Sequence, residues 1–578
     1  MKTLKLFLAL LLTTLTNEFL FAQCNPPTAQ ADLDIANVRA RILNGGDMWW
    51  DAVSQVGPKY EVPINSGKHS IFTGAIWMGA VDASSQLHVA AQTYRQDGHD
   101  FWPGPLDSTS CSITPTVSTQ FDHLWKINRQ DVINFIAGSP ATADMLSYPG
   151  NAPDGSMLAP FYDADGDGMY NSANGDYPDF GLNGNPDCCD ILHGDQAIWW
   201  VINDACNSHT ATGGMALGVE IQCQAYAYNT NNAAINNTTF YQYDIKNCSS
   251  NSYSAFYFGF FIDADLGNAI DDYVGCDVPR GMGYAYNCDN DDDGTAGYGL
   301  YPPAVGIDFL RGPLADAGDG IDNNRNCIID EPGETIIMSK FVYYNNDFTA
   351  TGNPVVAIDF YNYLRGVWKD GTPMTYGGSG YASGGPPCNF MFPGNSDHQY
   401  EWGTGGNCTT PAPAQADWSE AIAGNICGDR RFLMSSGPFT LLPGGVLNCI
   451  TMAAVWARDM NDPGPYYSLA ALQAADDVVQ VFFDSCYNVS ILGIPQLEII
   501  HASVYPNPVS DMLEISFGKT ISEGQFILYD IYGKKVTQVR VENRNQLSIS
   551  CKDFAGGIYL YRILTGDGKA GAGKVIIK

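Results

Sequence analysis

The chain consists mostly of short apolar runs separated by turn residues. Between positions 197 and 267, four runs rich in aromatic and β-branched residues are joined by Asn- and Gly-rich connections: AIWWVIND, GVEIQCQAYAYN, TTFYQYDIKNCS and YSAFYFGFFIDADLG. This spacing is typical of antiparallel strands in a sandwich. Further strands are predicted at 334–346, 354–364 and 449–458. The pattern predicts a mainly β fold, in which residues 23–490 form a large antiparallel, jelly-roll-like β-sandwich body with few helices and long loops.

Two segments have a helical period instead. Apolar residues recur at helical spacing in DHLWKINRQDVINFIAG at 122–138 and in YYSLAALQAADDVVQVFFDSC at 466–486. We interpret both apolar stripes as faces that pack on the core, and we expect the second helix to close the body.

The first 22 residues have the layout of a secretory signal peptide. Lys2 and Lys5 precede an apolar run, and cleavage is expected before Gln23. Every later apolar run is soon interrupted by Gly, Asn or Asp, so none approaches the roughly 18 residues needed to cross a bilayer. We therefore expect export through the inner membrane and no transmembrane segment after signal removal.

Charge divides the chain into two parts. The formal net charge is −33, of which residues 23–500 carry −37 and residues 501–578 carry +3. A strongly acidic body repels nucleic acid and anionic lipid, so we expect no nucleic-acid partner. The same charge suits divalent cations, although acidity also serves the general solubility of a secreted protein.

The cysteines fit an oxidising compartment. The chain has 16 cysteines, and only Cys551 lies beyond residue 500. The 15 upstream cysteines cannot all pair with one another, so we expect one free thiol there. Cys188 and Cys189 are neighbours in the sequence, which disfavours a disulfide between them and predicts that each pairs elsewhere.

The last 76 or so residues form a segment with its own pattern. From residue 503 onward, six or seven short strands are predicted, with turns at 523–524, 532–533, 543–545, 556–557 and 566–568. Four pieces stand in a fixed order: YPNP at 505–508, ILYDIYGKKV at 527–536, GGIYLYRI at 556–563 and GKVIIK at 573–578. The pattern alone predicts a small immunoglobulin-like β-sandwich after a linker at 491–502.

These four pieces resemble the type A C-terminal sorting domain of Bacteroidetes type IX secretion substrates. The resemblance covers residues 503–578, and the body is similar to secreted proteins of no defined activity that carry such tails. It implies a partner in the type IX secretion machinery and passage through the periplasm to the exterior or the cell surface. In such substrates the tail is often removed as the protein is attached to surface polysaccharide.

An acidic loop at 163–174, here loop one, has the spacing of a calcium loop. Its sequence DADGDGMYNSAN alternates oxygen-bearing side chains before a glycine turn, which lets one segment surround a hard cation. The predicted ligands are Asp163, Asp165, Asp167, the carbonyl of Met169, Asn171 and Asn174. A bidentate Glu is missing at position twelve, and Asp176 or Asp179 is the expected substitute.

Three other acidic groups are weaker candidates. In loop two, at 289–297, the predicted ligands are Asp289, Asp291 and Asp293. In loop three, at 319–331, they are Asp319, Asp322, Asn324, Asn326 and Asp330, with Glu331 beside them and Cys327 where such loops usually have Gly. A fourth group follows a predicted strand, with Asp263, Asp265, Asp271 and Asp272, and fits either a shared site or a solvated strand end.

The sequence lacks the common catalytic signatures. HExxH, GxSxG and a phosphate-binding glycine loop do not occur in it. We therefore expect a secreted or surface-attached β protein with structural calcium, acting in adhesion, matrix formation or glycan binding. The alternative is an extracellular hydrolase acting on polysaccharide, because a pair of catalytic carboxylates is defined by its spatial separation and leaves no sequence signature.

Overall fold

The computed structural model describes residues 23–95, 98–183, 188–461, 464–488, 502–530, 534–552, 554–565 and 570–578. The chain divides into two compact units, Met1–Val481 and Phe482–Lys578. The predicted signal peptide and nearly all of the predicted linker lie outside the described residues. The predicted domain boundaries near 490 and 502 therefore remain predictions.

The first unit is built around two large antiparallel sheets. One sheet has the order β21 (Lys340–Tyr344), β22 (Arg430–Leu441), β15 (Tyr253–Ala264), β6 (Thr73–Asp82), β3 (Asp47–Met48), β2 (Arg39–Leu43), β4 (Tyr60–Glu61) and β5 (His69–Ile71), with β1 (Gln30–Leu33) on β2 and β7 (Leu87–Ala91) on β6. The other has the order β16 (Asp272–Asp277), β17 (Met282–Asn287), β20 (Ala304–Arg311), β23 (Val446–Ala457), β14 (Thr238–Asn247), β13 (Val219–Ala227), β12 (Gln196–Asn203) and β8 (Trp102–Pro103), with β9 (Trp125–Asn128) on β12. The mainly β, antiparallel fold class is confirmed.

Aromatic side chains fill the space between the two sheets. The indole of Trp49 donates to the Tyr241 hydroxyl of β14 at 2.8 Å, and the Tyr60 hydroxyl of β4 donates to the carbonyl of Ala454 in β23 at 3.3 Å. Tyr243 of β14 and Phe258 of β15 pack with ring centroids 5.6 Å apart. These contacts join one sheet to the other across a fully buried core, which makes the unit a sandwich.

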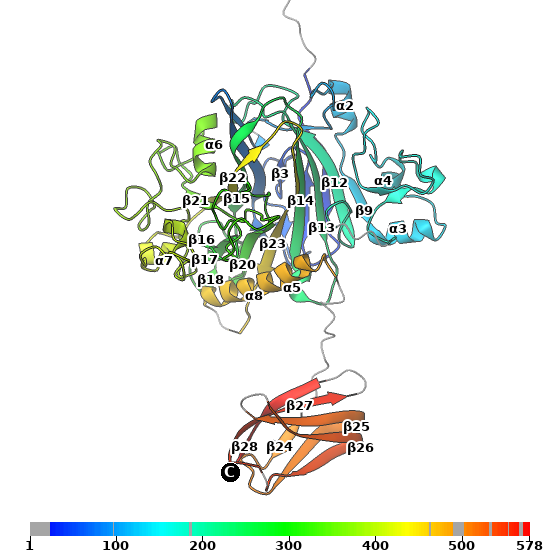
Figure 1. Ribbon diagram of the computed structural model, residues 1–578, viewed down its shortest axis with the longest axis vertical. Helices are drawn as coiled ribbons and strands as arrows, with labels where there is room; N and C mark the ends of the chain where they lie inside the picture. Colours follow the sequence, from blue (N-terminus) through cyan, green and yellow to red (C-terminus); the bar gives the residue numbers. More distant parts are fainter. Residues whose placement is uncertain are drawn as a thin grey trace, which may run out of the picture. The chain divides into compact units, whose positions relative to one another are not determined.

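Four consecutive strands were predicted between 197 and 267, and all four form. They are β12 to β15, but they do not share one sheet, because β12, β13 and β14 belong to the second sheet and β15 crosses to the first. In Figure 1, β14, β15 and β23 lie in the middle of this unit and its short helices lie around the edges. Sequence neighbours are therefore split between the two layers of the sandwich.

One predicted element is wrong in part and another is wrong in type. The segment 122–138 begins as strand β9, which pairs with β12, and only then becomes helix α3 (Arg129–Ile136). The segment 354–364, predicted as a strand, forms helix α6 (Ala357–Leu364), because the Asp359 carboxylate accepts from the amides of Val355 and Val356 and caps its start. The predicted closing helix is confirmed as α8 (Pro465–Asp484).

Short helices and ribbons fill the connections. The helices are α2 (Pro115–Gln120), α4 (Ala143–Leu146), α5 (Ala233–Asn236) and α7 (Glu420–Ala423), with 3₁₀ turns η2 (Ser172–Asn174) and η3 (Trp402–Thr404). Two small ribbons pair β10 (Phe161–Tyr162) with β11 (Tyr177–Pro178), and β18 (Asp291–Asp292) with β19 (Gly299–Leu300). Within the described residues, no helix is both long and apolar enough to cross a membrane.

Disulfides connect distant parts of the first unit. The pairs include Cys24–Cys206, Cys189–Cys449, Cys288–Cys427 and Cys327–Cys408. Cys188 is also disulfide-bonded, so the prediction that Cys188 and Cys189 have different partners is confirmed. The expectation of one free upstream thiol is wrong, because the free cysteines are Cys111, Cys223, Cys248, Cys276 and Cys388 in addition to Cys551.

The second unit contains one antiparallel sheet. Its strands are β24 (Ser503–Tyr505), β25 (Met512–Asp530), β26 (Lys535–Ser550), β27 (Gly557–Thr565) and β28 (Ala570–Ile577), in the order β24-β25-β27-β28 with β26 on β25. The turns predicted at 523–524 and 543–545 are wrong, since both lie inside long strands. The pairing of β25 with β26 shifts register between Ser516 and Ile521, and residues from both halves of β25 enter one core.

Candidate metal sites and binding pocket

Loop one brings its three aspartates together. One carboxylate oxygen from each of Asp163, Asp165 and Asp167 lies within 4.8 Å of the other two. Calcium–oxygen distances of about 2.3–2.6 Å would place such oxygens up to about 5 Å apart around one ion. The geometry is therefore compatible with a single cation between them.

Backbone amides already hold these carboxylates in place. Asp163 accepts from the amides of Gly166 and Gly168, both at 2.7 Å, and Asp167 accepts from the Met169 amide at 2.7 Å. These bonds, that of Gly168 foremost, lower the pKa of Asp163 below its ordinary value. The backbone of the loop thus orders these side chains and favours the ionised form of Asp163.

The rest of loop one is closed by a ribbon and a buried acid. Strands β10 and β11 flank the loop in place of the two helices of an EF-hand. The Asn174 amide donates to Asp165 at 2.8 Å, whereas the Asn171 oxygen accepts from the amide of Ala173. Asp176 is buried and accepts from the amides of Ala164 and Asn171, so it closes the loop from inside.

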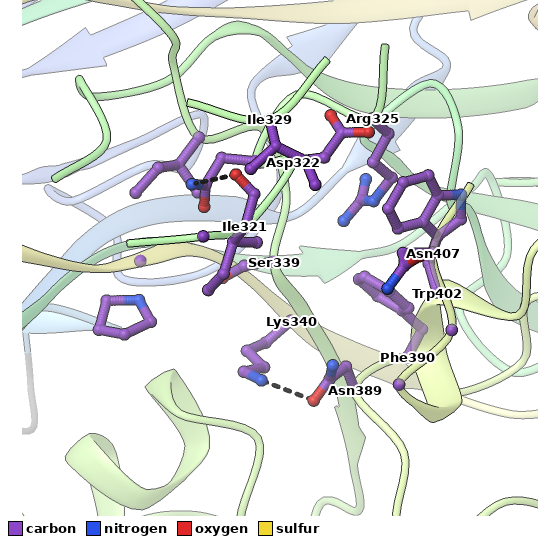
Figure 2. Close-up of a pocket in the computed structure, with 17 residues that line it drawn as sticks. Ile321, Asp322, Arg325, Ile329, Ser339, Lys340, Asn389, Phe390, Trp402 and Asn407 are labelled. Carbon is purple, nitrogen blue, oxygen red and sulfur yellow. Dashed lines mark hydrogen bonds between the residues drawn. The ribbon is translucent and has the colours of Figure 1, made fainter. Parts of the chain in front are cut away.

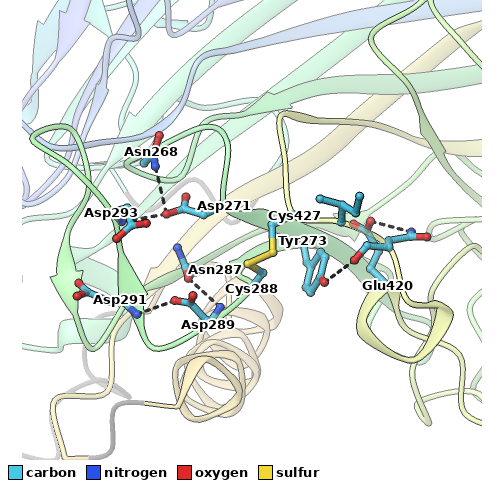
Figure 3. Close-up of a disulfide and its surroundings, with 12 residues drawn as sticks. Asn268, Asp271, Tyr273, Asn287, Cys288, Asp289, Asp291, Asp293, Glu420 and Cys427 are labelled. Carbon is cyan, nitrogen blue, oxygen red and sulfur yellow. Dashed lines mark hydrogen bonds between the residues drawn. A yellow bond between two sulfur atoms is a disulfide. The ribbon is translucent and has the colours of Figure 1, made fainter.

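Loop two does not gather its predicted ligands. Figure 3 shows Asp289, Asp291 and Asp293 spread along the segment that follows the Cys288–Cys427 disulfide. The Asp289 carboxylate accepts from the Asp291 amide, and the amide of Asp293 donates to Asp271. The inward-pointing acid is Asp292, which accepts from the amides of Asn268 and Tyr298 and whose burial raises its pKa to about 6.

Loop three is held by hydrogen bonds among its own side chains. The carboxylate of Asp322 accepts from the amides of Asn326 and Cys327, and Asp319 accepts from the Ile321 amide. Asp330 accepts weakly from Gly320, at 3.3 Å. The side-chain amides of Asn324 and Asn326 both donate to one oxygen of Glu331, at 2.7 and 2.6 Å.

Cys327 has a structural role in loop three. Its φ is +70°, the left-handed conformation that favours glycine, and its sulfur is bonded to Cys408. The residue thus adopts the backbone shape expected of the usual glycine and adds a covalent link. The sulfurs of Cys327 and Cys408 lie near Asp322, but as a disulfide they are not thiolate ligands.

A further acidic cluster lies where β15 meets β22. We call Asp263, Asp265 and Asp429 the interstrand aspartates; one oxygen of each lies within 4.8 Å of the other two. In the antiparallel register, Asp263 pairs with Arg431 and Ala264 with Arg430. The next position along brings Asp265 opposite Asp429, so all three acids lie on one face.

Only two of the three acids of this cluster could be grouped from the sequence. Asp263 and Asp265 were noted as acids after a strand, but Asp429 is 164 residues further along. Asp271 and Asp272, predicted with them, do not belong to the same trio. Asp429 carries no local signal, because only the strand register places it there.

The electrostatics of this cluster oppose those of loop one. Burial, followed by repulsion from Asp263 and Asp429, raises the pKa of Asp265 to about 8. Burial also raises the pKa of Asp263 to about 6, although Arg431 lowers it in part. The carboxylates of loop one are stabilised by amides, whereas these repel one another in a less solvated place.

A pocket lies beside loop three. Its volume is about 320 Å³, and its walls come from loop three, the start of β21, the segment 389–407 and residues 437–438 inside β22. Figure 2 shows Lys340 and Asn389 at one side of the pocket, with Trp402, Phe390 and Asn407 at another. No motif in the sequence marks Trp402 as part of a site.

Both apolar and polar groups line this pocket. Phe390 is covered by the Arg325 guanidinium, 4.9 Å from its centroid, and the half-buried Trp402 lies beside them. The Lys340 ammonium donates to the Asn389 oxygen at 2.6 Å. Burial, followed by the nearby Arg325 charge, lowers the pKa of Lys340 to about 8. Among the described residues of the lining, the only carboxylate is Asp322.

Comparison with known proteins defines the class of the chain through its tail. The described tail is a small antiparallel β unit, and residues 503–578 match the family model of the secretion system C-terminal sorting domain. The protein is therefore a type IX secretion substrate that carries such a tail, and it is secreted to the cell surface or the extracellular space. The predicted partnership with the type IX secretion machinery follows from the same match.

For the body, the comparisons are weak. No curated protein matches the sequence. A polysaccharide lyase aligns over 62% of this chain and 34% of its own length, with 7% identity and a TM-score of 0.15, so this chain spans about a third of the lyase. The BSP domain of a biofilm-associated protein aligns over 95% of this chain and 80% of its own, with 7% identity and a TM-score of 0.15. TM-scores this low give neither likeness weight for fold or function.

Proposed function

We propose that this secreted protein binds extracellular glycan without cleaving it, attached to the cell surface and with loops stabilised by calcium. The observation that carries the binding role is the pocket around Trp402, which combines an accessible indole with amide and ammonium groups. Adhesion or matrix formation would follow from such binding at the surface, to which the tail directs the chain.

The chemistry of the pocket suits a sugar. An aromatic ring offers an apolar face to the C–H groups of a pyranose, and Trp402 on the pocket wall supplies such a ring. The amides of Asn389 and Asn407 and the Lys340 ammonium offer hydrogen bonds to hydroxyl or carboxylate groups. A volume of about 320 Å³ accommodates one or two sugar rings and leaves the chain ends of a polysaccharide outside.

A single carboxylate argues against hydrolysis in this pocket. Glycoside cleavage uses two carboxyl groups about 5–9.5 Å apart. Asp322 accepts two backbone amides at 3.0 and 2.8 Å, which places its oxygens in a structural role.

One observation favours the alternative, an extracellular polysaccharide hydrolase. A second pocket of about 390 Å³ is lined by Asp476 and Asp477 of α8 together with Arg280. Burial raises the pKa of Asp476 to about 7, while Arg280 lowers it in part. The raised pKa suits Asp476 to the role of a general acid, and the exposed Asp477 next to it on the same helix supplies a second carboxyl group.

The binding proposal is tested with the purified chain on a glycan array, alongside an assay for new reducing ends on the same polysaccharides. We expect Trp402→Ala to lower binding at least tenfold and Phe348→Ala, which removes an exposed ring outside the pocket, to leave it unchanged. An equal loss of glycan binding in both variants would contradict binding at the Trp402 pocket. Release of reducing ends that disappears in Asp476→Asn would favour the hydrolase instead.

Calcium at loop one is tested by melting the purified chain in CaCl₂ and in chelator. When the free calcium concentration is a hundred times the Kd, binding to the folded state alone raises the free energy of unfolding by about 2.7 kcal/mol. We expect a higher midpoint in CaCl₂, and a smaller rise in the double variant Asp165→Asn with Asp167→Asn. An unchanged midpoint in the parent chain would reject calcium stabilisation.

A further inference from the structure

The interstrand aspartates combine three acidic groups with oxygens that have no partner. Asp263 is 3% exposed, and its Oδ1 is buried without a hydrogen-bond partner. The Oδ1 of Asp429 is likewise buried and unpartnered. Burying an unpaired carboxylate oxygen costs free energy that the fold must recover elsewhere, so both atoms require a positive group or a proton.

The positive charge at this cluster is the Arg431 guanidinium, which is hydrogen-bonded to the Oδ2 atoms. Arg431 donates to the Oδ2 atoms of Asp263 and Asp429, both at 3.3 Å, and to the Tyr94 hydroxyl at 2.9 Å. The Tyr94 hydroxyl in turn donates to Oδ2 of Asp263. All of these donors approach Oδ2, so the Oδ1 atoms of Asp263 and Asp429 are left without a hydrogen-bond donor.

A divalent ion would balance the charge of the three carboxylates in their ionised form. Three carboxylates and one guanidinium sum to −2, and placing Asp265 across the sheet from Asp429 is unfavourable for like charges. The mutual limit of 4.8 Å between the carboxylate oxygens is about twice a calcium–oxygen distance. An all-oxygen donor set selects a hard cation.

We propose that Asp263, Asp265 and Asp429 bind one calcium ion, held between the end of β15 and the start of β22. Oδ1 of Asp263, Oδ1 of Asp429 and the Asp265 carboxylate supply the protein ligands, and water completes the coordination. The ion joins the end of one strand to the start of the other through Asp265 and Asp429, which are 164 residues apart in the sequence. This site is outside the three acidic loops and does not rest on calcium in any of them.

The neighbouring structure holds Asp429 in position for this role. Cys427, two residues earlier, is bonded to Cys288, and the Gly428 amide donates to the Asp272 carbonyl at 3.2 Å. Figure 3 shows this disulfide beside Asp271. The segment that delivers Asp429 is therefore anchored independently of any ion.

The test counts bound calcium on the purified, chelator-treated chain after dialysis against CaCl₂. We expect Asp265→Asn and Asp429→Asn each to lose one calcium per chain, and Asp370→Asn, an exposed aspartate of the same unit, to lose none. The calcium-induced rise in melting midpoint should shrink in the first two variants only. Substituting MgCl₂ for CaCl₂ should give at least a tenfold weaker apparent affinity, because the wide, partly irregular donor set suits the larger ion.

The calcium count and the melting midpoint together distinguish a bound ion from a proton shared between two of the aspartates. If Asp263 and Asp265 share a proton instead of binding an ion, Asp265→Asn leaves the calcium count unchanged and raises the midpoint equally in chelator and in CaCl₂. That result overturns the proposal. Loss of calcium only in loop-one variants would overturn it too, while leaving calcium stabilisation by that loop intact. Asp429 is partly exposed, so Asp429→Asn provides a folded variant if Asp265→Asn is too unstable to purify.

Discussion

Loop one and the interstrand aspartates are both trios of acids, but they meet in different ways. In loop one, the three aspartates lie within five residues, two are exposed and one is half-buried, and local backbone amides donate to their carboxylates. In the interstrand trio, two acids end one strand, the third begins its neighbour, and two oxygens are buried without partners. A local loop can be complete without a cation, whereas a cluster formed by strand pairing retains uncompensated charge.

The largest expected effect comes from removing the disulfide that anchors Asp429. Cys288 and Cys427 are 139 residues apart, so the double variant Cys288→Ser with Cys427→Ser should lose about 4–5 kcal/mol of unfolding free energy in the chain-entropy model. Denaturant unfolding under oxidising conditions measures this. We also expect at least tenfold weaker calcium binding at the interstrand aspartates, with binding at loop one retained.

The control for that variant is another long-range disulfide. Removing Cys24–Cys206, with a separation of 182, should cost a similar free energy without changing calcium binding at the interstrand aspartates. Equal loss of calcium in both double variants would break the comparison, because it would show a general loosening of the unit.

The second effect is a pH dependence of the calcium-free chain. The pKa of Asp265 rises from 3.8 to about 8 on folding, so the folded state keeps a proton that the unfolded state releases. Its stabilising contribution is therefore complete below about pH 4 and is lost as the pH rises to about 8, at no more than about 1.4 kcal/mol per pH unit. Unfolding in chelator across this range should show the decline, and Asp265→Asn should flatten it.

Loop one should respond in the opposite direction. The pKa of Asp163 is lowered by amide hydrogen bonds, so its contribution is present above the ordinary carboxyl pKa and is lost as the pH falls through its folded pKa. For the Asp265 prediction above, a loss of stability toward high pH that persists in Asp265→Asn would show that another buried acid, such as Asp476, causes that loss.

The smallest effect is expected at Asp163 itself. Asp163→Ala removes the acceptors for two backbone amides in an exposed loop, so we expect the calcium-free melting midpoint to fall by about 1–2 °C. Asp163→Asn keeps one acceptor oxygen and should fall less. A midpoint change larger than that of the disulfide variant would show that loop one supports the whole unit, contrary to its local character.

Prediction from the sequence succeeded where one short stretch decides the outcome. The strands at 197–267 form where short contiguous runs of aromatic and β-branched residues are separated by turn residues, and loop one gathers its acids because alternate positions of one turn lie close together. It failed at 354–364, where Asp359 caps a helix in a run of strand-forming residues. It failed again at 125–128, where pairing with β12 overrides a helical period.

The sequence by itself determined the destination of the protein, the mainly β class and the grouping of the three aspartates of loop one, since each depends on a contiguous pattern. Only the tertiary structure decided that β15 leaves its neighbours for the other sheet, that Asp429 meets Asp263 and Asp265, and that Trp402 and Lys340 share a pocket. The physical reason is that strand register and sheet packing join residues far apart in the chain, and a one-residue shift would have turned Asp429 to the opposite face.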